Sequence, residues 1–189
     1  MDAADRHHHH SPDEAGALTA TAIAATLHCL TGCAIGEIVG LVLGTAFGLS
    51  NLATIVLSIA LAFVFGYALT SYPLLRAGLA LAAVVPIALA SDTLSIATME
   101  LVDNLIMVLV PGAMESGLGS LLFWGSLSFA LAVAAAVTVP VNRYLIARGK
   151  GHAVVHETGV HGGPSTRVVG LATSAAFLFG AAVLAAEAV

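Results

Sequence analysis

Charge is what this sequence has least of. Only 9% of its 189 residues are Asp, Glu, Lys or Arg, whereas soluble domains carry about 25%. The six basic residues form no cluster interleaved with aromatics, which excludes a nucleic-acid partner. With 59% hydrophobic residues and a mean hydropathy of +0.99, the composition predicts an all-α integral membrane protein in contact with lipid.

Catalytic signatures are also missing. The chain has no GxSxG, HExxH, Walker glycine loop or dinucleotide fingerprint. Of its histidines only His28 falls in a predicted span, so paired haem ligands across spans are absent. Cys29 and Cys33 are the only two cysteines, and an i, i+4 pair on one helix is poorly oriented to close a disulfide. We therefore expect no enzymatic activity, a thiol oxidoreductase included.

The apolar runs define the predicted organisation. Residues 1–16 form a polar tail, in which His7 to His10 are either native or the remnant of an expression tag. Residues 17–189 form one transmembrane helical domain. Four spans are predicted directly, over residues 17–49, 52–69, 118–141 and 168–186, with a cytoplasmic loop at about 142–167.

Residues 74–111 allow two interpretations, because as one helix they would reach about 57 Å, nearly twice the hydrocarbon thickness. Either two short spans meet near residues 91–93, or an in-plane helix over 74–86 leads into one span over 89–111. Arg143, Arg148, Lys150 and Arg167 place the 142–167 loop in the cytoplasm. Arg76 shares that side only in the second case, which favours five spans over six.

Metal-type ligands gather near the start of the first apolar run. Cys29, Cys33 and Glu37 are spaced i, i+4, i+8, so they share one helix face, and His28 begins the neighbouring stripe. A carboxylate at the bilayer centre costs at least about 2.5 kcal/mol. Glu37, Glu100 and Asp103 lack basic residues at their own depth, so bound cations or protons are expected to neutralise them.

Soft ligands follow in the third predicted span, where Met99, Asp103 and Met107 share one face. Thiolates and thioethers favour Cu(I), while carboxylates and imidazole accept Zn(II) or Fe(II). The sequence therefore predicts transport or intramembrane binding of a transition-metal ion, Cu(I) favoured, coupled to release of protons from the ligands. The predicted ligands are His28, Cys29, Cys33, Glu37, Met99, Glu100, Asp103 and Met107.

The same residues have a plainer interpretation. Cysteines and methionines in a span are often core residues, and buried carboxylates can relay protons or hold helices together. Glycines at every fourth position allow close helix approach, as in GxxxG pairs: Gly32, Gly36, Gly40, Gly44 and Gly48. Their partner is helix three or four of the same chain, or helix one of a second subunit in a homo-oligomer. The alternative function is thus a non-catalytic assembly or scaffold subunit.

A peripheral metal site is a further hypothesis. His152 and His156 stand at i, i+4 in the cytoplasmic loop, a spacing that lets two imidazoles chelate one cation on a helical turn. The surrounding glycines argue against a stable helix, and exposed histidines near a membrane are often only solvated.

Four blocks of the chain carry a resemblance to a known family. Residues 28–37 follow the pattern HCxxGCxxGE, and further blocks are 95–104 (SIATMELVDN), 111–114 (PGAM) and 140–143 through 148–152 (PVNR to RGKGH). Over about residues 20–156 the chain resembles a bacterial family of small multi-span membrane proteins classed as a domain of unknown function. Some members carry copper-related labels. The resemblance implies a multi-pass protein of the bacterial inner membrane and supplies no mechanism.

Overall fold

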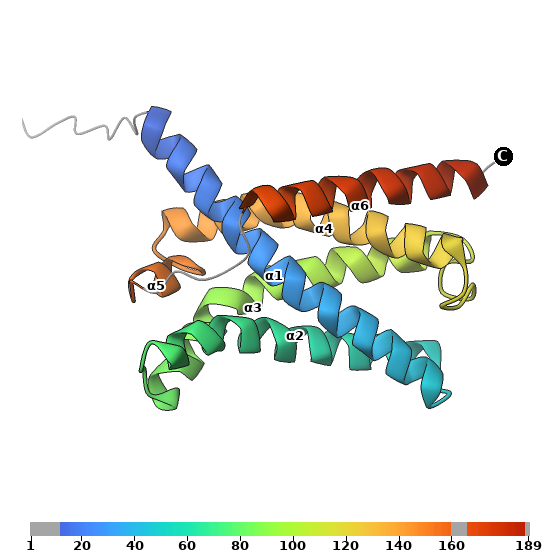
Figure 1. Cartoon of the computed structure of the whole chain (residues 1–189), viewed down its shortest axis with the longest axis horizontal. Coiled ribbons are helices and arrows are strands. Elements are labelled where there is room, and N and C mark those ends of the chain that lie inside the picture. Colours follow the sequence, from blue (N-terminus) through green and yellow to red (C-terminus); the bar gives the residue numbers. More distant parts are fainter. Residues whose placement is uncertain (1–11, 160–165, 188–189) are drawn as a thin grey trace, which may run out of the picture.

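The chain folds into an all-helical bundle. The computed structural model describes residues 12–159 and 166–187 of the chain. Its helices, in order, are α1 (Pro12–Ala46), α2 (Asn51–Arg76), α3 (Leu81–Leu109), α4 (Leu121–Ala147), the short α5 (Ala153–His156) and α6 (Thr166–Glu187) (Figure 1). α1 crosses the other helices obliquely, and α6 lies along α4.

Within the described residues, four helices are long and apolar enough to cross a membrane: Glu14–Ala46, α2, α3 and α4. This is consistent with a multi-pass membrane protein. α6, with 22 residues, covers the last predicted span as a helix but is not among those four. A count of five or six spans is therefore not confirmed.

Residues 74–111 contain one candidate span, as the second interpretation predicted, but residues 74–86 are not a separate helix before it. α2 continues through Pro73 to Arg76, and α3 is one uninterrupted helix past residues 91–93. Pro73 lies in the last turn of α2, and proline is tolerated in membrane helices because neighbouring groups and local adjustments satisfy the backbone carbonyl that it leaves free. The Ser91 and Thr93 hydroxyls donate to the carbonyls of Ala88 and Leu89, so these polar side chains are satisfied without breaking the helix.

Other boundaries also differ from the prediction. α1 begins at Pro12, inside the expected tail, because the fixed φ of proline suits the first turn of a helix. It ends at Ala46, and α4 continues to Ala147, so the loop is shorter than the expected 142–167. His7 to His10 lie outside the described residues.

Small side chains determine how α1 packs on α2. A Cβ placed on Gly32 would lie 2.6 Å from the Gly66 Cα, and one on Gly36 would overlap the Ala62 backbone. Gly40 and Gly44 similarly face α2, at Ser58 and Thr54. The partner is thus α2 rather than the predicted helix three or four. Gly48 lies beyond α1, in a turn with φ +62°, and takes no part in this contact.

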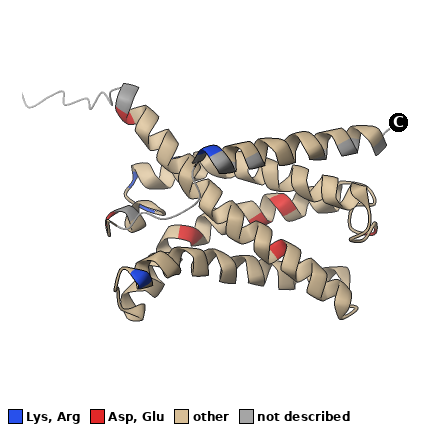
Figure 2. Ribbon diagram, viewed as in Figure 1, with Lys and Arg blue, Asp and Glu red and all other residues tan. Residues whose placement is uncertain are grey.

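The bundle has two distinct ends. We call the end with residues 77–80 and 148–159 the loop end, and the end with residues 47–50 and 110–120 the turn end. Basic segments lie toward the loop end, where α5 folds back onto α3, while acidic segments lie along α1 and α3 in the interior (Figure 2).

Candidate functional site

A buried stripe of polar and ionisable residues runs between α1 and α3. We call it the polar stripe. Its members are His28, Cys29, Cys33 and Glu37 on α1 and Asp92, Ser95, Glu100 and Asp103 on α3, and each is at most 8% exposed. Because both helices run in the same direction, the two rows lie in register.

Three carboxylates meet in the middle of the polar stripe. Glu37, Glu100 and Asp103 are close enough for their charges to repel one another. Oε2 of Glu37 and both carboxylate oxygens of Asp103 have no hydrogen-bond partner among the described residues. Glu100 Oε2 accepts a long 3.5 Å hydrogen bond from Asn104 Nδ2. In the described part of the chain, no lysine or arginine forms an ion pair with them. We call these three residues the carboxylate cluster.

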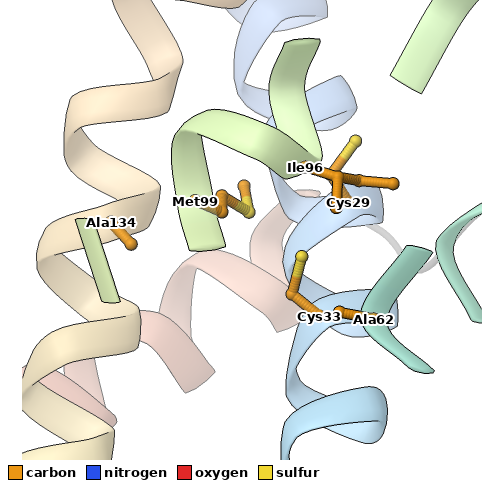
Figure 3. Packing of buried hydrophobic residues seen from close by; sticks show 6 residues of the cluster. All are labelled: Cys29, Cys33, Ala62, Ile96, Met99 and Ala134. Atoms are coloured by element: carbon orange, nitrogen blue, oxygen red, sulfur yellow. The ribbon is translucent and has the colours of Figure 1, made fainter. Parts of the chain in front are cut away.

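The two thiols lie one turn apart on α1 and face carboxyl groups rather than each other. The Cys33 thiol lies near the Glu100 carboxyl group, and Cys29 Sγ lies 3.9 Å from Asp92 Oδ1. Both thiols are free and buried. Met99 extends from α3 into the same apolar cluster (Figure 3). The two thiols and Met99 therefore belong to one apolar cluster, and each thiol also lies near a carboxyl group.

Met107 lies apart from the other predicted ligands. It is two helical turns beyond Met99, about 12 Å along α3, and packs with Leu41, Phe123 and Leu127 toward the turn end. The predicted set of eight ligands is therefore not one site, because the straight α3 cannot bring both methionines to the same thiols. Sequence periodicity placed them on one face but could not show this separation.

At the loop end the polar stripe meets a residue from outside the helices. His152 Nδ1 lies 3.2 Å from Asp92 Oδ1, and its ring centroid is 5.4 Å from that of His28. His28 Nε2 is 2.9 Å from Thr70 Oγ1 of α2. His152 thus points into the bundle and not toward a loop site. The side chain of His156, its predicted partner, lies outside the described residues.

Asn142 connects three helices near the same end. Its Oδ1 accepts from Ser95 Oγ at 2.9 Å, and its Nδ2 donates to Thr26 Oγ1 at 2.9 Å. Sequence reasoning missed Asn142 and gave Asp92 no role in the site. The positive φ angles of Gly149 and Gly151 allow the chain reversal that brings His152 back. In the sequence, those two glycines were the feature from which the chain reversal could have been predicted.

The predicted metal ligands are not arranged as a complete metal site. Within the described residues, no three His, Cys, Asp or Glu side chains form a group that could hold a metal ion as placed. In the described part of the chain, the polar stripe is therefore not a preassembled metal site.

The bundle and its buried polar stripe define a class: helical proteins with several membrane-competent segments and ionisable groups between them. Residues 19–151 match the family described as "Domain of unknown function (DUF4396)", and the chain belongs to that family. The chain matches no curated protein and no solved structure.

Proposed function

We propose that this protein binds a transition-metal cation between α1 and α3 and moves it across the membrane in exchange for protons. The observation that carries the proposal is the carboxylate cluster, at most 5% exposed and without a basic partner among the described residues. A buried carboxylate costs at least about 2.5 kcal/mol in a membrane, and three together repel. A cation or protons remove that cost, and metal binding displaces protons from its ligands.

The donor set favours a borderline divalent ion. Carboxylates and imidazole accept Zn(II) or Fe(II), whereas Cu(I) prefers thiolates and thioethers. At the middle of the polar stripe, three carboxylates outnumber one thiol and the Met99 thioether. The distance of Met107 removes one of the two thioethers on which a preference for copper rested. We therefore propose Zn(II) or Fe(II) ahead of Cu(I).

The scaffold alternative has less support. Gly32, Gly36, Gly40 and Gly44 pack against α2 of the same chain, so this face of α1 is occupied. Assembly with a second subunit would need another surface.

A transport measurement tests the proposal. The protein, without His7 to His10, is placed in vesicles that report Zn²⁺ entry and internal pH. We expect Zn²⁺ uptake with opposite proton movement, and at least about tenfold slower uptake in Glu37→Gln and Asp103→Asn, a loss of about 1.4 kcal/mol. Glu115→Gln is the matched control, because Glu115 is exposed at the turn end.

Two results would contradict the proposal. One is uptake by Glu37→Gln and Asp103→Asn at the unsubstituted rate; the other is no movement of Zn²⁺, Fe²⁺ or Cu⁺ by the unsubstituted protein. Elemental analysis of protein purified without oxygen identifies the ion. Copper that is lost in Cys29→Ser/Cys33→Ser would favour Cu(I), whereas zinc or iron lost in Asp103→Asn would favour the carboxylates.

A further inference from the structure

The chain after α4 folds back over the loop end of the bundle. Gly149 and Gly151, with φ +65° and +60°, turn the backbone so that α5 packs against α3. Val155 is buried with Leu74 of α2 and Val84 of α3. This packing holds His152 against Asp92, at the loop end of the polar stripe.

Exposure decreases from His152 inward. The His152 side chain is 12% exposed, whereas Asp92, which it contacts, is fully buried. Oδ1 of Asp92 faces both His152 and the Cys29 thiol, and Oδ2 has no hydrogen-bond partner among the described residues. A buried carboxylate with one unpartnered oxygen, reached through an imidazole at the surface, is suited to accept a cation from outside.

We infer that Asp92 and His152 form an entry site where a divalent transition-metal ion joins the polar stripe before it reaches the carboxylate cluster. This inference rests on the proposed function. Imidazole and carboxylate are both ligands for Zn(II), and water completes the coordination. A transit site must bind weakly enough to release its ion, which agrees with two protein ligands rather than four.

The plainer interpretation is that the pair only fixes the loop. Substitution of His152 by glutamine distinguishes a metal entry site from a contact that only fixes the loop. The amide of His152→Gln still donates a hydrogen bond to Asp92, so a purely structural contact survives, but an amide is a poor zinc ligand. Asp92→Asn removes the charge at nearly constant shape.

The test is calorimetric titration of Zn²⁺ into the full chain without His7 to His10. The background is Glu37→Gln/Asp103→Asn, which removes two of the three carboxylates of the carboxylate cluster. We expect that background to retain a weaker site. Adding His152→Gln or Asp92→Asn should lower its affinity at least about tenfold, or 1.4 kcal/mol. Adding Glu115→Gln should leave it unchanged. Elution as one folded species in detergent verifies each variant.

The outcomes distinguish the two proposals. Unchanged affinity in His152→Gln would overturn the entry site. So would a complete loss of binding in Glu37→Gln/Asp103→Asn, although the central site would then stand. If Glu37→Gln/Asp103→Asn binds Zn²⁺ as tightly as the unsubstituted protein and the added His152→Gln abolishes that binding, the entry site is supported. The carboxylate cluster is then not a zinc site. Absence of binding in the unsubstituted protein would overturn both.

Discussion

Asn142 and Asp103 are both about 1% exposed, and they differ in their surroundings. Each end of the Asn142 amide has a partner on another helix. Neither oxygen of Asp103 has one among the described residues. A buried polar group without a partner costs about 1–3 kcal/mol. Asn142 therefore stabilises the bundle, whereas the unpartnered carboxyl group of Asp103 lowers its stability, a cost that the cation or protons of the proposed function would remove.

Asn142→Ala should lower the free energy of unfolding by about 1–3 kcal/mol, because it leaves buried hydroxyls of Ser95 and Thr26 with one partner fewer. Unfolding by denaturing detergent, followed by circular dichroism, measures the change. Zn²⁺ affinity should stay near that of the unsubstituted protein. Unchanged stability would contradict the structural role assigned to Asn142, and a lost zinc site would place Asn142 among the ligands.

At the scale of elements, the contact of α1 with α2 depends on the absence of side chains. The positions on α2 that face the glycines are themselves small and recur every fourth residue: Thr54, Ser58, Ala62 and Gly66. Two matched rows bring the backbones close enough for dispersion contacts over residues 32–44 of α1, and such packing is a main attraction between helices in lipid.

Gly36→Ala should destabilise the protein by about 1–3 kcal/mol or more, because the new methyl group meets the Ala62 backbone, which cannot move aside as a side chain can. The control lies in the same helix. Gly16 is exposed with nothing within 4 Å of an added Cβ, so Gly16→Ala should stabilise by roughly 0.5–1 kcal/mol. Equal effects of the two substitutions in detergent unfolding would refute the close packing of α1 on α2.

At the scale of the whole molecule, successive long helices alternate in direction, and basic residues gather toward the loop end (Figure 2). Arg76 and Lys150 belong to the loop end, and Glu115 to the turn end. Lysine and arginine near span ends favour the cytoplasmic side. The loop end, with Asp92 and His152, should therefore face the cytoplasm.

Cysteine labelling in whole bacterial cells tests this orientation. Glu115 and Lys150 are both exposed, so Glu115→Cys should react with a membrane-impermeant maleimide from outside, and Lys150→Cys only after the cells are opened. The chain with its two native, buried cysteines gives the background signal. Labelling of Lys150→Cys in intact cells would show that the protein is inserted the other way round.

Hydropathy was enough to predict the helical membrane class and the approximate position of each long helix. The physical reason is that a backbone in hydrocarbon must satisfy its own hydrogen bonds, so apolar runs become helices. Boundaries failed where the prediction treated proline or a polar triplet as a break, at Pro73 and residues 91–93. Helical periodicity also indicated that Cys33, Glu37, Glu100 and Asp103 would lie on buried faces, as they do.

By itself, then, the sequence determined which residues are apolar, which faces of α1 and α3 carry carboxylates and thiols, and which face of α1 is bare. Only the tertiary structure decided what meets those faces. It put α2 on the glycines, separated Met107 from the cysteines, and brought His152 to Asp92. Periodicity is a local property of one helix, whereas these contacts join residues up to 60 positions apart, and their choice depends on how all the helices pack together.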